Sequence, residues 1–439
     1  MKTTLCRLVR RRLAILAACG LPVAISIPSI ATATDDSTNR VESVGEETTV
    51  TVPGLDAAIK VFLPTNYVAT RKWPAIFYYH AMNHTPDTAI LRAFTASRDY
   101  ILVGLPYLAD GASQTTAAER EAALQRELSG FRASRAWVAA HTAMDERRVF
   151  LAGASKGGWM TARLGEHELS RLAGLIIMLS GRVLYAQQSA LAAALPGKPI
   201  YVGAGETDAN LIPALEAREY YRRNGATVTL EIFTGVGHEV PTQAARLTEW
   251  LEAHGRYGES PEPQAFEALK TSFRDRAAQI KAEQDPATKY AALADVVQNP
   301  LLALCLPASI PGITSQLAAL RARLPVQQAE WQAEETFNEI LWNGTKLRRL
   351  ADQKAVRDDL KKLSESLPDT RYGKLAADFY VRMAAAYEKS AEATRQAEAA
   401  APKAKPPTST GPTSVPFAPI LGHEPRPVMR QNGKKITFQ

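Results

Sequence analysis

The sequence predicts an α/β fold with a mostly parallel sheet and helices on both of its faces, followed by a separate all-helical domain. Two observations lead to this prediction. From about residue 40 to 256, short apolar runs that suit strands alternate with longer segments that suit helices. Beyond Pro261-Glu262-Pro263 the strand runs stop and only helical spacing remains. A chain of 439 residues is long enough for two domains.

The strands are predicted from continuous runs of apolar and β-branched residues. The clearest is PAIFYYH at 74–80, because a strand that is buried on both faces needs apolar residues at every position. The expected strands cover residues 48–52, 58–63, 74–80, 100–106, 149–154, 174–180, 199–203 and 227–233. The expected helices around them include residues 117–141, 211–223 and 242–253.

The second half of the chain carries helical spacing at residues 266–283, 289–297, 327–342, 347–363 and 373–398. We therefore predict an α/β domain over 40–256 and a helical domain over 264–398. The helical domain could be a lid, a spacer or a surface that docks another protein. Residues 399–439 are rich in Pro, Ala and Lys, which predicts a linker and a disordered tail.

The N-terminus has the features of a bacterial export signal. Basic residues from Lys2 to Arg12 precede an apolar segment, and Ala31-Thr32-Ala33 matches a cleavage site, so residues 1–33 are predicted to be a signal peptide. Leu16-Ala17-Ala18-Cys19 also matches a lipobox, and lipidation of Cys19 would anchor the protein to a membrane. The expected location is periplasmic or extracellular, with a lipoprotein as the alternative.

Charge and cysteine content exclude several classes of protein. The net charge is +7, but the first 33 residues carry five basic residues and no acid, which leaves +2 and no sign of a nucleic-acid-binding surface. The cysteines are Cys6, Cys19 and Cys305, so the sequence is not a disulfide scaffold, and Cys305 is expected to be a buried thiol. No cysteine–histidine cluster has the spacing of a metal site.

The segment RRVFLAGASKGGWMTAR, residues 147–163, contains a G-x-S-x-G pattern centred on Ser155. Strand formers precede it and helix formers follow it. A sharp strand-to-helix turn at a serine exposes the hydroxyl above the sheet, and flanking glycines allow the strand and the helix to pass closely. The following helix N-terminus points backbone N–H groups at an oxyanion that forms there.

A serine nucleophile needs a base and a carboxylate that orients the base. Ala204-Gly205-Glu206-Thr207-Asp208 follows the strand predicted at 199–203, and Thr234-Gly235-Val236-Gly237-His238 follows the strand predicted at 227–233. Asp208 lies where its loop meets a helix, so it could instead be a helix N-cap. Glu206, two residues earlier, is the alternative acid.

With these residues, the region from about 45 to 255 resembles the α/β-hydrolase superfamily, in particular secreted esterases related to polyhydroxybutyrate depolymerases, feruloyl esterases and dienelactone hydrolases. The resemblance implies Ser155 as nucleophile, Asp208 as orienting acid and His238 as base, acting on a small or polymeric ester with no cofactor. It also implies an oxyanion hole made by the N–H of Lys156 and, by position, that of Met82.

Some features leave alternatives open. Ala81 stands where similar esterases carry glycine, which leaves the second oxyanion donor open. His80 is expected to hold that loop, and His84 either lines the pocket or faces solvent. The Ser-Lys-Gly-Gly elbow, with Met160-Thr161 after it, also resembles secreted serine aminopeptidases, so a peptidase is the first alternative. A catalytically silent cell-envelope binding protein is the second. Lys156 would favour anionic substrates if it faced the pocket, and otherwise projects from the helix start.

Overall fold

The structure is a computed structural model, and it describes residues 43–109, 116–182, 191, 193–257, 262–344 and 350–400. The predicted signal peptide, Cys19 in its lipobox and the predicted tail beyond residue 400 lie outside the described residues. Among the helices in the described ranges, none combines the length and the apolar character that crossing a bilayer requires.

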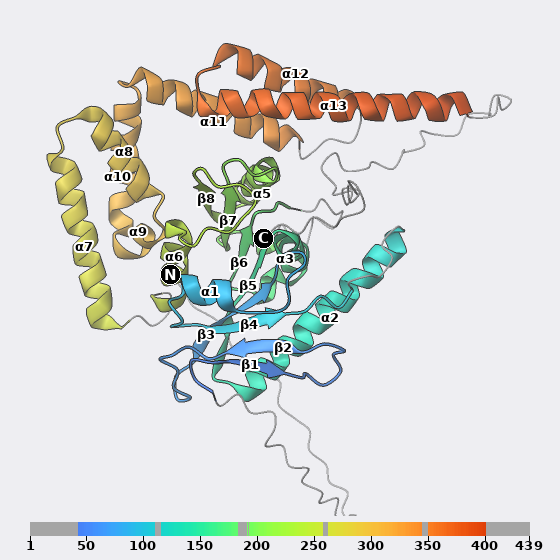
Figure 1. The fold of residues 1–439 in the computed structure, drawn as a ribbon. Helices are drawn as coiled ribbons and strands as arrows, with labels where there is room; N and C mark the ends of the chain where they lie inside the picture. Colours follow the sequence, from blue (N-terminus) through green and yellow to red (C-terminus); the bar gives the residue numbers. More distant parts are fainter. Residues whose placement is uncertain are drawn as a thin grey trace, which may run out of the picture. The chain divides into compact units, whose positions relative to one another are not determined.

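The centre of the fold is a sheet of eight strands in the order β1-β2-β4-β3-β5-β6-β7-β8 (Figure 1). The strands are β1 (Glu47–Val50), β2 (Ile59–Phe62), β3 (Trp73–Tyr79), β4 (Ile101–Leu105), β5 (Met144–Ala154), β6 (Gly174–Met178), β7 (Pro199–Gly205) and β8 (Thr227–Phe233). β2 pairs antiparallel with β1 and with β4, and all the other pairs are parallel. This order, with the antiparallel β2 inserted beside β4, is the α/β-hydrolase fold, which confirms the predicted α/β class with its mostly parallel sheet.

The helices that follow the strands cover both faces of the sheet, as the sequence predicts. They are α1 (Ala89–Phe94), α2 (Ala117–His141), α3 (Lys156–Glu168), α5 (Leu211–Arg223) and α6 (Ala245–Leu251). Alternate residues of β3 point to opposite faces, so Phe77 packs in the core with α2, α3 and α5, whereas Ile76 packs in the core with α1 and α6. All of β3 is buried, which explains its uninterrupted apolar sequence.

Local capping signals account for several boundaries. Helix α2 begins after Thr116, whose hydroxyl accepts from the backbone N–H of Glu119 while the Glu119 carboxylate accepts from the N–H of Thr116. The helix predicted at 242–253 starts later, at Ala245, and continues as a π-helical turn, Glu252–Arg256. The strand predicted at 149–154 starts earlier, at Met144.

The helices that follow the sheet form two groups. The first contains α7 (Pro263–Ala282), α8 (Pro286–Val297), α9 (Pro300–Cys305) and α10 (Ile310–Arg321), and these helices share a core that also includes Ala253 and Tyr257. Cys305 is buried in that core, as predicted.

The second group contains α11 (Pro325–Gly344), α12 (Leu350–Ser366) and α13 (Arg371–Ala400). Its buried side chains, among them Phe337 and Leu360, belong to the same core as the α5 face of the sheet. Arg218 and Arg223 of α5 form ion pairs with Glu334 and Glu339 of α11. The three helices of this group therefore continue the core of the sheet.

Candidate active site

Ser155 lies at the junction of β5 and α3 in a strained backbone conformation. Its φ is +55° and its ψ is −117°, values that a residue with a side chain rarely adopts. The neighbouring glycines make the turn feasible, because a Cβ on Gly153 would lie 2.1 Å from the carbonyl oxygen of Gly157. A Cβ on Gly157 would lie 1.9 Å from the carbonyl oxygen of Tyr79 in β3. The strand-to-helix turn that the sequence predicts at Ser155 is therefore present, and it needs both glycines.

The structure brings together the three side chains that the sequence singles out. The Oγ of Ser155 lies 2.7 Å from Nε2 of His238, and Nδ1 of His238 lies 2.9 Å from Oδ1 of Asp208. Since a carboxylate oxygen only accepts hydrogen bonds, Nδ1 carries the proton and Nε2 accepts from the serine hydroxyl. A hydroxyl, an imidazole and a carboxylate in this order can activate the hydroxyl as a nucleophile.

The two loops that carry Asp208 and His238 are joined by further hydrogen bonds. The backbone N–H and the hydroxyl of Thr207 donate to the carbonyl of Val236 at 3.0 and 3.1 Å. The backbone N–H of Glu206 donates to the carbonyl of Phe233 at 3.0 Å. The loops pack so closely that a Cβ on Gly205 would lie 2.0 Å from the carbonyl oxygen of Gly237. These contacts fix the acid and the base relative to each other.

The structure distinguishes the two candidate acids. Asp208 is 4% exposed, and its Oδ1 also accepts from the backbone N–H of Asn210 at 2.9 Å. The residue at the N-cap position of α5 is Asn210, so Asp208 is not the N-cap. Glu206 accepts from the backbone N–H of Gly235 at 2.9 Å instead of from the imidazole. Of the two carboxylates, only Asp208 has a hydrogen bond to His238 in the structure.

Electrostatics prepares His238 to accept a proton. The hydrogen bond to Asp208 raises the pKa of His238 above its usual 6.5, and partial burial opposes this increase. A raised pKa makes the imidazole a stronger base for the serine proton.

The two predicted oxyanion donors lie in different segments: Lys156 directly follows Ser155, and Met82 lies in the loop after β3. Lys156 is the first residue of α3, where backbone N–H groups point away from the helix. Met82 lies in a turn closed by the N–H of His84, which donates to the carbonyl of Ala81 at 3.3 Å, and Asn83 of that turn has a φ of +65°. Met82 is 59% exposed. The assignment of both residues as donors stays a prediction.

Two histidines near this turn differ in their surroundings. His80 is buried, its Nδ1 donates to the carbonyl of Ala81 at 2.8 Å, and its own carbonyl accepts from the hydroxyl of Tyr107. It holds the turn, as the sequence predicts. His84 is exposed and faces solvent.

The side chain of Lys156 reaches the ring of Tyr107, a residue that follows β4. Its Nζ lies 3.9 Å from the centre of the Tyr107 ring, and that ring stacks on Tyr79 with a centroid distance of 5.4 Å. A cation over the face of an aromatic ring is attracted by the ring's negative face. The ammonium group therefore has a specific neighbour near the start of α3.

Sequence reasoning missed one residue that helps to place His238. Glu231 of β8 accepts from the backbone N–H groups of Arg246 and Leu247 at 3.1 and 3.0 Å, and from the hydroxyl of Tyr201 at 2.6 Å. A carboxylate at a helix N-terminus is favoured by the helix dipole. Glu231 thereby anchors α6, the element at the far end of the histidine loop. No sequence signal marks this role, because in the sequence Glu231 is simply a polar residue within a strand and nothing indicates that it contacts α6.

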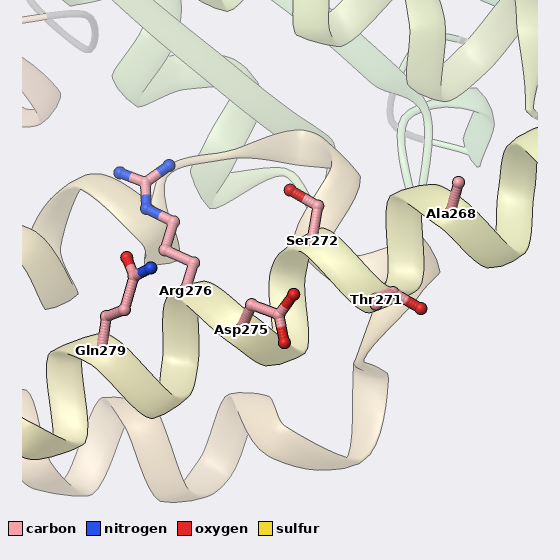
Figure 2. Close-up of a pocket in the computed structure, with 6 residues that line it drawn as sticks. All are labelled: Ala268, Thr271, Ser272, Asp275, Arg276 and Gln279. Carbon is pink, nitrogen blue, oxygen red and sulfur yellow. The ribbon is translucent and has the colours of Figure 1, made fainter.

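Elsewhere, the structure has a shallow hollow along one face of α7. All its lining residues come from that single helix, as Figure 2 shows: Ala268, Thr271, Ser272, Asp275, Arg276 and Gln279. No histidine or cysteine is among them. Across the described ranges, no group of three or more His, Cys, Asp or Glu side chains could hold a metal ion.

No family model and no curated protein matches the chain. Among solved structures, it is similar to a ferulic acid esterase from the anaerobic fungus Anaeromyces mucronatus, with 14% identity, 44% of this chain and 84% of that chain covered, and a TM-score of 0.34. It is also similar to a phospholipase/carboxylesterase from Dyadobacter fermentans, with 13% identity, 48% and 96% covered, and a TM-score of 0.34. A feruloyl esterase module from Clostridium thermocellum gives 16% identity, 47% and 87% covered, and a TM-score of 0.32.

Proposed function

We propose that this protein is a serine hydrolase that cleaves carboxylic esters through an acyl-enzyme intermediate, with Ser155 as nucleophile, His238 as base and Asp208 as orienting acid. The observation that carries the proposal is the 2.7 Å contact between the hydroxyl of Ser155 and Nε2 of His238. The fold supports it, because all three side chains follow the carboxyl ends of parallel strands, where ligands bind in open α/β sheets.

In the first half of the reaction, Oγ of Ser155 attacks the ester carbonyl while Nε2 of His238 takes the hydroxyl proton. The carbonyl oxygen becomes an oxyanion, which the backbone N–H groups of Lys156 and Met82 are proposed to stabilise. Asp208 stabilises the imidazolium through Nδ1. Nε2 then gives its proton to the leaving alkoxide, and an acyl-serine remains.

In the second half, water attacks the acyl-serine and His238 takes a proton from it. Collapse of the second tetrahedral intermediate releases the carboxylic acid, and Ser155 regains a proton from Nε2. Every proton passes through one imidazole nitrogen, so the cycle needs no cofactor. Removing Ser155 or His238 should lower kcat by several orders of magnitude.

The test combines active-site labelling with turnover. A fluorophosphonate probe should label the wild-type protein at Ser155, and Ser155→Ala should abolish both the labelling and the hydrolysis of p-nitrophenyl acyl esters. Ser272→Ala is the matched control, because Ser272 is an exposed serine on α7. An unlabelled, inactive wild-type protein that is folded would refute the proposal and favour a catalytically silent binding protein.

The Ser-Lys-Gly-Gly elbow makes a peptidase the alternative activity. The same triad serves both reactions, since only the leaving group differs, an alcohol in one case and an amine in the other. Parallel assays of p-nitrophenyl esters and aminoacyl anilides at equal concentration separate the two. Faster turnover of the anilides would replace the esterase proposal with the peptidase.

We also propose that the protein is exported. The support is the basic and apolar pattern of residues 1–33 and the Ala31-Thr32-Ala33 site. Mass spectrometry of the protein recovered from the cell envelope and the medium tests this: a mature N-terminus at Thr34 indicates secretion, and a lipidated N-terminal Cys19 indicates a lipoprotein. An N-terminus that retains residues 2–12 would contradict export.

A further inference from the structure

We propose that α13 is part of the active-site scaffold, with Arg371 and Arg382 as positioning residues for the loop that carries Asp208. This inference rests on the proposed function, because it concerns how the catalytic acid is held. It assigns a role to a helix that lies more than 150 residues beyond the acid in the sequence.

The two arginines contact the loop on both sides of Asp208. Nη1 of Arg382 donates to the carbonyl of Ala209, the next residue, at 3.3 Å. Nη2 of Arg371 lies 3.8 Å from Oε1 of Glu206, which precedes Asp208 by two residues. The same Glu206 carboxylate accepts from the N–H of Gly235 in the histidine loop. Arg371 therefore acts on both loops through one carboxylate.

The spacing along α13 explains how one helix reaches both points. Arg371 and Arg382 are separated by about three turns at 3.6 residues per turn, so they lie on the same face of the helix. An intrahelical ion pair with Asp378 holds the guanidinium of Arg382. Two long side chains from one face can thus converge on a short loop.

Helix α13 is itself firmly attached, so it can serve as a reference for the loop. Tyr372, Ala376, Phe379 and Met383 form a buried stripe with helical spacing. The Tyr372 ring packs against Phe337 of α11 with a centroid distance of 5.7 Å. At the start of the helix, the backbone N–H of Arg371 donates to both oxygens of Glu330 at 3.0 and 3.1 Å.

Asp208 needs such external support because its carboxylate has few attachments of its own. Oδ1 accepts from both His238 and Asn210, whereas Oδ2 is buried and has no hydrogen-bond partner in the part of the chain that the structure describes. One oxygen fixes the position of the carboxylate but constrains its orientation weakly. The backbone on either side of Asp208 must supply the remaining constraint, and Arg382 binds that backbone directly.

The experiment uses the full-length protein with Arg382→Ala, Arg371→Ala and the double variant. We expect kcat for a p-nitrophenyl ester to fall about three- to tenfold in Arg382→Ala and further in the double variant, since a partly exposed, charge-assisted hydrogen bond contributes modestly. KM should stay within about twofold, because neither arginine is proposed to touch the substrate. Arg382→Lys should restore part of kcat, because an ammonium can still donate to the Ala209 carbonyl.

Lys374→Ala is the control, since Lys374 is an exposed cation of the same helix. It should leave kcat and KM unchanged. Thermal melting of every variant separates positioning from stability. A fall in kcat that is measured well below the melting temperature of each variant supports positioning. An unchanged kcat in the double variant overturns the proposal.

A second readout does not depend on turnover. The pKa of His238, followed by NMR of its imidazole, should be lower in the double variant than in the wild type, because a misplaced Asp208 stabilises the imidazolium less. Among the charged groups near His238, Asp208 is bonded to its ring, Glu206 is bonded to the same loop at Gly235, Glu239 is its chain neighbour and Lys156 adjoins Ser155. Arg371 and Arg382 contact the Asp208 loop through Glu206 and the Ala209 carbonyl. Removing two cations alone would raise the pKa, so the sign of the change distinguishes positioning from direct charge effects. An unchanged or raised pKa refutes the proposal even if the wild type hydrolyses no ester.

Discussion

Asp208 presents a fully buried carboxylate to the Nδ1 atom of His238, a side chain that is 45% exposed. The acid is thus screened from water by the protein, while the imidazole remains accessible to a substrate. The carboxylate also raises the pKa of the imidazole. This relationship governs how activity should depend on pH.

We expect kcat/KM of the wild-type protein to rise with pH through a single step, because only the neutral imidazole accepts the serine proton. The midpoint should lie above the usual 6.5 of histidine, since Asp208 raises the pKa of His238. In Asp208→Asn the midpoint should move down, and kcat should fall by about 10³- to 10⁴-fold because the tautomer is no longer fixed. Initial rates from pH 5 to 9 measure both effects.

The same shift in pKa affects stability with a defined sign. A raised pKa in the folded state stabilises the folded protein at pH values below the unfolded pKa of about 6.5, and this contribution is lost as pH rises through the folded pKa. The free energy of unfolding, measured with urea, should therefore decrease more from pH 5.5 to pH 8.5 in the wild type than in His238→Ala. Equal differences would contradict the raised pKa.

Gly157→Ala should abolish activity and lower the melting temperature. Its new Cβ would lie 1.9 Å from the backbone carbonyl of Tyr79, and a backbone atom in the central sheet cannot move aside cheaply. Gly312→Ala in α10 is the matched control, because a Cβ added at Gly312 would have no neighbouring atom within 4 Å. That change should stabilise the protein by about 0.5–1 kcal/mol. Ester hydrolysis and thermal melting measure the pair, and an active Gly157→Ala protein would contradict the close packing.

Glu216 of α5 should make stability depend on pH in the opposite sense from a paired carboxylate. Burial raises the pKa of Glu216 from 4.5 to about 7. Its cost to the folded state is absent below pH 4.5 and grows as pH rises toward 7. Glu216→Gln should therefore gain more stability relative to wild type at pH 8 than at pH 5, by urea unfolding. The exposed Glu365→Gln should show no such change between the two pH values, and an equal response of both variants would rule out the raised pKa.

The helices that follow the sheet should contribute to the stability of the α/β fold. Phe337 of α11 is fully buried in the core that α5 and the sheet share. Phe337→Ala should lower the free energy of unfolding by about 3–5 kcal/mol, a typical loss for a large buried aromatic side chain. Val326→Ala on the same helix should change it by less than about 0.5 kcal/mol, because Val326 is 69% exposed. Denaturant titration measures both variants. If Phe337→Ala lowered the free energy of unfolding as little as Val326→Ala, α11 would not be part of this core.

The sequence predicts the sheet well because local patterns determine it. Runs such as PAIFYYH are buried on both faces, and a strand buried in this way must be apolar at every position, which makes it easy to recognise. The helices at 117–141 and 211–223 match α2 and α5 at both ends. The prediction for β5 starts five residues late, because Asp145 and Arg148 interrupt the apolar run while forming an ion pair with each other. Helix α1 was missed because a segment of six residues is too short to reveal a helical period.

The candidate site was predictable in part for the same reason. Ser155, Asp208 and His238 each follow a recognisable strand, so their order along the chain suggests that they meet. The contacts of Arg382 with the acid loop and of Glu231 with α6 were not predictable. They depend on how elements pack after folding, and neither residue stands out in its own segment.

The histidine loop is fastened at both of its ends by glutamates, Glu206 at Gly235 and Glu231 at the first turn of α6. A loop held at both ends loses little conformational entropy when a substrate binds. On heating, the protein should therefore remain active until the edge of the sheet that carries these loops unfolds. Loss of turnover and loss of structure should then occur at one temperature.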